Sequence, residues 1–363
     1  MTNFYWSATK VNVANYCDMK FFLRYFLKKE PLRLSAYVKG SLLHSLIENF
    51  WEKLGTPEEA VSTSKKFKNK KYFDAESFAK YAQGLWKRII VADKNAPKIS
   101  WSYKEEPWVI VSQMEKICIP LFNYFVNNPR PLFKELPFDF KVGNERFKGR
   151  IDEIRVRDGK IILRDYKSGY PWVGEMKLKH DPQLTLYNAG VCARLHSDLE
   201  FVRQLGLEGK IDEFMAGNSF VSPNLSLEFF MIEALGVNPE KVKSVPNPIN
   251  STSRKDTHFY EVLKMVEGTK RAAETGDIHP EFGKKCDICD EKRACDEESE
   301  KIGQGWMEHK GNLSLEFIHP EYIKRNNEEN TPPILIPDAI RVKKSKGKRE
   351  KDPNQMGFKF RYN

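Results

Sequence analysis

One tight turn constrains this chain more than any other feature: Asp158-Gly159, set between two runs of strand-forming residues. A two-residue type I′ turn needs positive φ at both central positions, and Asp-Gly is among the pairs that adopt it most readily. The flanking residues, 149–157 and 160–167, contain the β-branched and leucine side chains typical of strands. If residues 158 and 159 form the turn, Asp152 faces Asp165 across the hairpin.

The alternation of side chains along a strand puts Asp152, Asp165 and Lys167 on one face of this hairpin. Two carboxylates directly opposite each other repel, so a purely structural sheet gains nothing from them. A hard divalent cation removes the repulsion, because Mg²⁺ is held by one or two carboxylates together with substrate phosphate oxygens. The pattern therefore predicts a metal-dependent phosphodiesterase site. Solvated charges at strand ends are the ordinary alternative.

Two motifs, Gly149-Arg150-Ile151-Asp152 and Asp165-Tyr166-Lys167-Ser168-Gly169, resemble the core of the PD-(D/E)XK nuclease superfamily. More narrowly, they are similar to the RecB-type branch, where the pattern is G-x-x-D followed by D-Y-K-T/S-G. The resemblance implies an α/β fold with a restriction-endonuclease-like core and a mixed central sheet. It also implies Mg²⁺ or Mn²⁺ bound by Asp152 and Asp165, with the backbone carbonyl of Tyr166 as a further ligand and Lys167 as a catalytic residue.

Two expected helices carry further candidates. In residues 36–54 His44 interrupts an apolar face one turn before Glu48, and a lone histidine there is more often a core residue than a ligand. The segment resembles the family motif G-x-x-x-H-x-x-x-E, which implies that His44 helps to bind the metal and leaves Glu48 as a second-tier candidate.

The other helix is expected to begin at Asp181-Pro182, an N-cap followed by a proline in the first turn. Gln183 and Tyr187 share one face of it and resemble the family's Q-x-x-x-Y signature, which implies contact with the DNA strand near the metal. Ordinary helix surface is the alternative. Glu135, in an expected strand at 132–142, is a second-tier metal candidate.

Three cysteines, Cys286, Cys289 and Cys295, form a compact C-terminal triplet that needs a fourth ligand, and Cys17 is the candidate. Thiolate ligands favour an iron–sulfur cluster or zinc. The arrangement resembles the 4Fe–4S staple of AddB-type helicase–nucleases and of CRISPR-adaptation nucleases, which implies a cluster that stabilises the fold. A structural Zn²⁺ at the same four cysteines stays open as the alternative.

The sequence divides into four expected regions: N-terminal helices in 1–56, a helical insertion in 57–131, the nuclease core and cluster motif in 132–300, and a polar, basic and flexible tail in 301–363. Other expected elements are one helix over 4–29 capped by Ser7 or Thr9, a helix over 107–127, a strand over 225–234, a loop at 247–251 and a helix over 258–275. We expect Cys118 and Cys192 to be buried core residues.

The net charge of +10 favours a polyanionic partner, and the 24 Phe, 14 Tyr and 7 Trp residues make aromatic stacking surfaces available on the protein. No apolar run is expected to span a membrane and no leader is visible, which predicts a soluble protein in the reducing cytoplasm. We expect a metal-dependent DNA exonuclease with little sequence preference, acting in recombination, repair or CRISPR-adaptation-like processing beside a separate helicase, recombinase or integrase. The alternatives are a flap or single-strand endonuclease on the same core, or a nucleic-acid-binding module with a vestigial site.

Overall fold

The computed structural model describes residues 4–62, 70–92, 99–101, 106–215, 219–275, 278, 284–297 and 334–335. The basic tail expected at 301–363 lies outside the described residues, apart from the short strand β6 (Ile334–Leu335).

A mixed six-stranded sheet forms the centre of the molecule, in the order β5-β4-β3-β2-β1-β6. β3 runs parallel to β4, and β1 runs parallel to β6, while the other neighbours are antiparallel. The remaining strands are β1 (Phe133–Val142), β2 (Glu145–Arg157), β3 (Lys160–Lys167), β4 (Ser226–Met231) and β5 (Ile249–Thr252).

The turn at Asp158-Gly159 has the predicted form. Asp158 has φ of 52° and Gly159 has φ of 72°, as a type I′ turn requires. The register that follows sets Ile154 opposite Leu163, which confirms the predicted pairing of the hairpin. The ladder ends at the next pair, Glu153 with Arg164, so the predicted pairing of Asp152 with Asp165 is not part of it.

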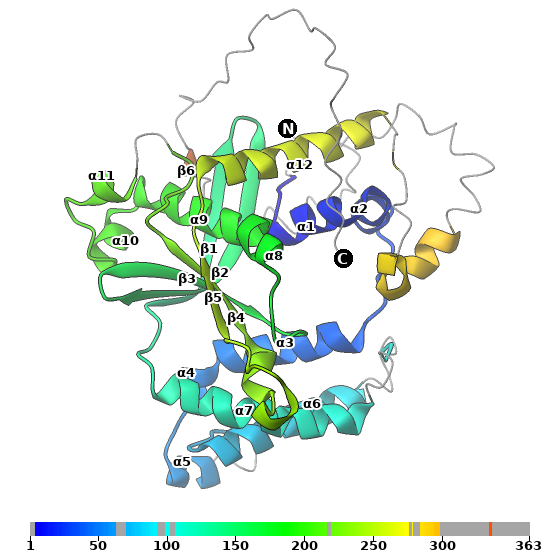
Figure 1. Ribbon diagram of the computed structural model, residues 1–363, viewed down its shortest axis with the longest axis vertical. Coiled ribbons are helices and arrows are strands. Elements are labelled where there is room, and N and C mark those ends of the chain that lie inside the picture. Colours follow the sequence, from blue (N-terminus) through cyan, green and yellow to red (C-terminus); the bar gives the residue numbers. More distant parts are fainter. Residues whose placement is uncertain are drawn as a thin grey trace, which may run out of the picture.

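Helices cover both faces of the sheet (Figure 1). One face packs against α1 (Ala8–Tyr16), α9 (Pro182–Leu195) and α12 (Asp256–Thr275), and the other against α3 (Ser35–Glu48), α6 (Ala75–Ala92) and α7 (Pro107–Val126). Each face has its own hydrophobic core. The shorter helices are α2 (Asp18–Tyr25), α4 (Phe50–Lys53), α5 (Pro57–Ser62), α8 (Glu175–His180), α10 (Leu199–Gln204), α11 (Ile211–Phe214), η3 (Ile232–Gly236), η4 (Pro239–Lys241) and η5 (Lys284–Ile288).

Three expected elements differ from the structure. The single helix expected over 4–29 is two helices, because Cys17 has an extended backbone (φ −172°, ψ 127°) between α1 and α2. The helix expected over 36–54 breaks at Asn49 into α3 and α4. The loop expected at 247–251 is partly the edge strand β5, since its backbone pairs with β4. The N-cap is Ser7, one of the two expected residues, and it accepts a hydrogen bond from the N–H of Lys10.

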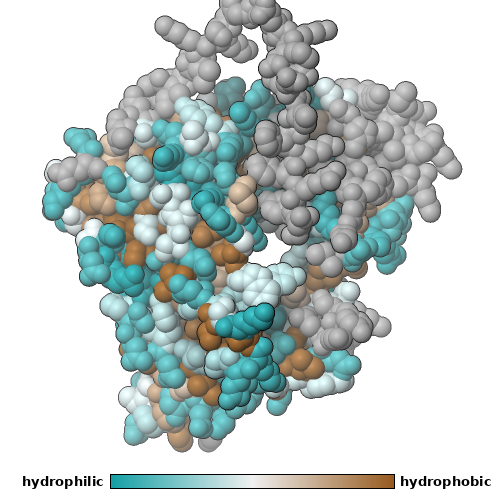
Figure 2. Space-filling model, in the orientation of Figure 1, coloured by the Kyte–Doolittle hydropathy of each residue, from teal (hydrophilic) through white to brown (hydrophobic). Residues whose placement is uncertain are grey.

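The helix α7 corrects the expectation that no apolar run is long enough to span a membrane. It has 20 residues and, by length and composition alone, is apolar enough to cross a membrane, and it is the one such helix among the residues described. Its inward side chains, including Leu121, Phe122 and Phe125, are buried in the core beneath the sheet. The same length and composition therefore suit a core helix. The face of the molecule in Figure 2 is mostly hydrophilic, with small hydrophobic patches between.

Candidate active site

The two predicted carboxylates, Asp152 on β2 and Asp165 on β3, meet at the end of the central hairpin. The hydroxyl of Tyr187 lies 3.0 Å from Oδ1 of Asp152 and 3.2 Å from Oδ1 of Asp165. The other oxygen of Asp152 accepts a hydrogen bond from the backbone N–H of Tyr166 at 3.0 Å. The structure therefore brings both carboxylates under one tyrosine hydroxyl.

The strand β2 is distorted at Asp152. Its pairing with β1 skips the position where Glu135 would face Asp152. Glu135 has φ of 47°, a left-handed conformation that a residue with a side chain rarely adopts and that costs about 1–3 kcal/mol. Ile151 and Ile154 both pack in the core beside α9 although they are three residues apart, so the alternation of side chains shifts between them. Such local strain is typical of functional sites.

Lys167 and Gln183 complete the contacts of Asp165. The ammonium of Lys167 lies 2.7 Å from Oδ2 of Asp165 and donates a hydrogen bond to Oε1 of Gln183 at 2.6 Å. The amide of Gln183 in turn donates to Asp165 and to the hydroxyl of Tyr187. Gln183 is held there because Asp181 caps α9 by accepting a hydrogen bond from its backbone N–H at 2.8 Å.

Burial changes the acidity of these groups. Desolvation raises the pKa of Asp152 to about 6, although hydrogen bonds from Tyr166 and Tyr187 act in the opposite direction. Desolvation also raises the pKa of Asp165 to about 7, against the charge of Lys167 and with the charge of Asp152. The carboxylates around Lys167 outweigh the effect of its burial and raise its pKa. The pair of carboxylates therefore holds protons more tightly than exposed aspartates do.

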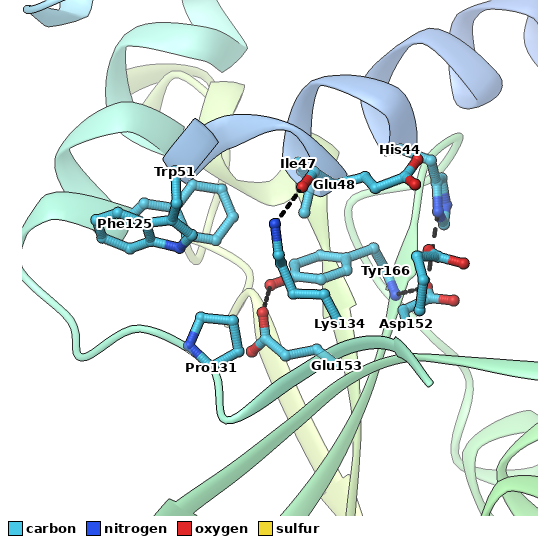
Figure 3. Close-up of a pocket in the computed structure, with 11 residues that line it drawn as sticks. His44, Ile47, Glu48, Trp51, Phe125, Pro131, Lys134, Asp152, Glu153 and Tyr166 are labelled. Carbon is cyan, nitrogen blue, oxygen red and sulfur yellow. Dashed lines mark hydrogen bonds and ion pairs between the residues drawn. The ribbon is translucent and has the colours of Figure 1, made fainter. Parts of the chain in front are cut away.

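A pocket opens beside Asp152, between α3 and the end of the sheet (Figure 3). His44 points at Asp152, with Nδ1 3.6 Å from Oδ2, and burial lowers the pKa of its imidazole. Glu48, one turn further along α3, and Glu135 line the same pocket. Burial raises the pKa of Glu135, and the nearby charge of Glu48 adds to the effect. The structure thus places both second-tier residues near the predicted metal ligands.

The donor set around Asp152 fits a hard divalent cation. It offers carboxylate oxygens and one imidazole, and the ammonium of Lys167 contacts Oδ2 of the fully buried Asp165 at 2.7 Å. Within those residues, however, no three His, Cys, Asp or Glu side chains form a group arranged to hold a metal ion. The ammonium of Lys167 already offsets the negative charge of Asp165. Binding a cation there would require these side chains to move closer together.

A buried charged network behind the site was missed from the sequence. The hydroxyl of Tyr166 donates to Oε2 of Glu153 at 2.5 Å, and Glu153 also pairs with Arg155. Arg164 donates twice to Oε2 of Glu228 on β4. All of these side chains are buried, and the network anchors the ring of the residue whose N–H holds Asp152. The sequence signal for this network was the presence of charged residues at alternate positions of a strand that was expected to be central and therefore buried.

The four predicted cluster cysteines lie on neighbouring elements, but within the part of the chain that the structure describes no three of them form a group arranged to hold a metal ion. Cys17 separates α1 from α2, and it shares a small hydrophobic cluster with Cys295. The charge of Cys17 is also among the causes that raise the pKa of Cys289, after burial. Cys286 lies in η5 and is half-buried. Cys118 and Cys192 are buried in the two main cores, as predicted.

Ion pairs dock the cysteine triplet onto α2. Arg24 contacts Asp290 at 2.5 Å and Glu291 at 2.8 Å, and Lys20 contacts Asp290 at 2.5 Å. Asp290 and Glu291 are buried, so these pairs are shielded from water. The hydroxyl of Tyr16 also donates to the backbone carbonyl of Lys285 at 2.6 Å. These contacts bring together segments about 270 residues apart in the sequence.

A comparison with curated proteins finds no match. A family model does match, and it covers residues 5–296, from the first helix through the cysteine triplet. That family is described as the PD-(D/E)XK nuclease superfamily. The mixed sheet with helices on both faces is the α/β architecture expected from the resemblance of the motifs. The match covers more than half of the chain and shows that this protein belongs to the PD-(D/E)XK nuclease superfamily.

Proposed function

We propose that this protein is an intracellular, metal-dependent DNA exonuclease with little sequence preference, acting in recombination, repair or CRISPR-adaptation-like DNA processing. The observation that carries the proposal is the convergence of Asp152, Asp165, Lys167, Gln183 and Tyr187 in one hydrogen-bonded site. Membership of a nuclease superfamily supports a phosphodiester substrate.

Asp152, Asp165, His44 and the backbone carbonyl of Tyr166 would hold Mg²⁺ or Mn²⁺, with Glu135 and Glu48 close enough to support the shell. When bound, such a cation acidifies water and offsets the negative charge that builds up on a phosphate. Lys167 would orient the attacking water and stabilise the extra charge of the transition state. The water oxygen bonds to phosphorus, the bond to the leaving oxygen breaks, and the proton of the water passes to the leaving group.

Gln183 and Tyr187 would hold the two carboxylates in position and orient the DNA strand. In the structure they contact Asp165, Lys167 and Asp152 directly, so they are well placed to fix the geometry of the acids. Contacts to phosphates carry no sequence information, which supports cleavage without strong sequence preference.

There are two alternatives to an exonuclease: the first is separated from it by an assay, and the second by the residues of the site. A flap or single-strand endonuclease would use the same residues, and only the substrate separates it from an exonuclease. A vestigial binding module is disfavoured because Asp152, Asp165 and Lys167 are all present, with Lys167 paired to Asp165 and the hydroxyl of Tyr187 joining Asp165 to Asp152.

The test is digestion of end-labelled single- and double-stranded DNA with Mn²⁺, beside circular DNA of both kinds. We expect linear DNA to be degraded and circular DNA to survive, while cleavage of circular single strands would favour the endonuclease. Lys167→Ala should abolish cleavage and keep DNA binding. Lys160→Ala, at the exposed start of the same strand, is the matched control and should cleave normally. Normal cleavage by Lys167→Ala would remove the mechanism.

The cysteine site supports a second part of the proposal, a structural 4Fe–4S cluster held by Cys17, Cys286, Cys289 and Cys295. Its support is the chemistry of four thiols and the docking of the triplet onto α2. Closing so long a loop would stabilise the fold. We expect an anaerobically purified brown protein with about four irons per chain. A colourless protein with one zinc would replace the cluster with the zinc alternative.

A further inference from the structure

Two aromatic rings stand in solvent directly after the catalytic strand. Tyr170 is 69% exposed and Trp172 is 64% exposed, on the loop that joins β3 to α8. Side chains of this size normally bury most of their surface, since burial is their largest contribution to stability. Their ring centroids lie 6.4 Å apart, at an angle of 39°, so the two rings form one surface.

The loop that carries these rings is anchored at both ends. At its start Ser168 packs against α3, because a Cβ on Gly40 would lie 2.6 Å from the Ser168 hydroxyl. Gly169 has φ of 124°, a conformation open to glycine, and this turns the chain out from the sheet. At its far end Val173 packs against the core beside α9. The exposure of the rings is therefore set by a fixed loop and not by a chain terminus.

The position of the rings relates them to the proposed catalytic site. Trp172 is five residues after Lys167, so their Cα atoms lie within about 17 Å of each other even if the loop is fully extended. That span corresponds to about five stacked nucleotides of one strand. Lys177 on the next helix, α8, is exposed and adds positive charge beside the loop, whereas Lys179 is paired with Glu175 at 2.5 Å. Apolar rings with a lysine nearby suit an anionic ligand that has flat faces.

We infer that Tyr170 and Trp172 form a stacking platform for unpaired bases of the DNA strand that enters the catalytic site. The inference rests on the proposed function and deepens it, because it assigns single-stranded or unwound DNA as the substrate class. Bases inside a duplex are stacked on both faces and offer none to these rings, whereas unpaired bases can stack on them whatever their sequence.

The test measures binding in EDTA, where metal-dependent cleavage cannot interfere. The ligands are oligothymidylate, an abasic oligomer with the same number of phosphates, and a fully paired G·C duplex. We expect Trp172→Ala to weaken oligothymidylate binding by about five- to 150-fold, the usual effect of removing one stacking ring. Binding of the abasic oligomer and of the duplex should change less than about twofold, because their contacts are to phosphates.

Two matched variants separate stacking from a general loss of surface. Trp172→Phe keeps a ring and should restore most of the binding. Trp108→Ala removes a ring that is 67% exposed at the start of α7 and should leave all three affinities unchanged. Melting temperatures close to that of the wild type would show that each variant is folded.

Equal loss of binding to all three ligands, or no loss with any of them, would overturn the inference, and the second result would instead suit a protein partner on the rings. Failure of the inference is distinct from failure of the proposed function. A protein that binds oligothymidylate through Trp172 but cleaves nothing keeps the platform and loses the nuclease. A protein that degrades DNA equally well after Trp172→Ala, with unchanged KM and kcat, keeps the nuclease and loses the platform.

Discussion

The affinity of the site for Mn²⁺ should depend steeply on pH below neutrality. The two carboxylates have pKa values raised to about 7 for Asp165 and about 6 for Asp152, mainly because they are buried. A cation bound by a carboxylate must first displace any proton on it. Exposed aspartates, with pKa values near 4, would bind with nearly constant affinity above about pH 5.

The magnitude follows from the number of protons displaced. Above about pH 7 both acids are ionised and the affinity should be level. Between about pH 7 and 6, metal binding displaces one proton from Asp165, so the affinity should fall about tenfold for each unit by which the pH is lowered. Below about pH 6, metal binding also displaces a proton from Asp152, and the affinity should fall by up to about a hundredfold for each unit of pH.

The stability of the metal-free protein should change in the opposite direction. A carboxyl group whose pKa is raised by folding binds more protons in the folded than in the unfolded state. The free energy of unfolding therefore falls as pH rises from about 4 to about 7. Added Mn²⁺ should stabilise the protein most above pH 7, where no proton competes with it.

Calorimetric titration of Mn²⁺ between about pH 5.5 and 8, in buffers of different ionisation enthalpy, gives both the affinity and the protons released. Asp165→Asn removes the upper ionisation, so its affinity should be weaker overall but level down to about pH 6. Constant affinity of the wild type across this range, or release of no protons at pH 6, would refute the assignment of the buried pair as metal ligands.

Four further substitutions test the packing and hydrogen bonds that support the site. Tyr187→Phe should weaken Mn²⁺ binding or cleavage about ten- to a hundredfold, because it removes the hydroxyl between the carboxylates, and an unchanged affinity and rate would contradict that role. Gly190→Ala should lower the free energy of unfolding by about 1–2 kcal/mol, since its Cβ would lie 2.7 Å from Phe138, whereas Gly268→Ala, with open space around it, should raise it by about 0.5–1 kcal/mol in the same urea denaturation. Arg164→Met should cost about 3–5 kcal/mol by leaving Glu228 buried without its partner, and a loss below 1 kcal/mol would show that the pair is dispensable.

The features that could be predicted from the sequence were local. The Asp-Gly turn fixed the hairpin register, because only a few residue pairs tolerate two positive φ angles in succession. The start of α9 at Asp181 followed from capping chemistry in the same way. Both predictions depend on neighbouring residues alone, and both are confirmed by the structure.

The features that could not be predicted depend on contacts between distant segments. Glu135 is a second-tier candidate from the sequence, but its left-handed backbone within β1 was not predicted, because the sequence has no glycine or asparagine there to indicate it. Asp290 and Glu291 look like solvated acids beside the cysteines, but they are buried because Lys20 and Arg24 arrive from the other end of the chain. The break of the first helix at Cys17 has no signal in helix propensity, since cysteine does not stop a helix, and it lies directly before α2, which docks onto the cysteine triplet.

The most direct measurement is an anomalous difference map from crystals of the protein soaked in Mn²⁺ above pH 7. We expect one strong peak about 2.0–2.3 Å from carboxylate oxygens of both Asp152 and Asp165, and a weaker peak in Asp165→Asn crystals soaked at the same Mn²⁺ concentration. A saturating soak that leaves these two carboxylates without a peak, or that places the ion on other residues, would contradict a metal-dependent nuclease site at the end of the hairpin.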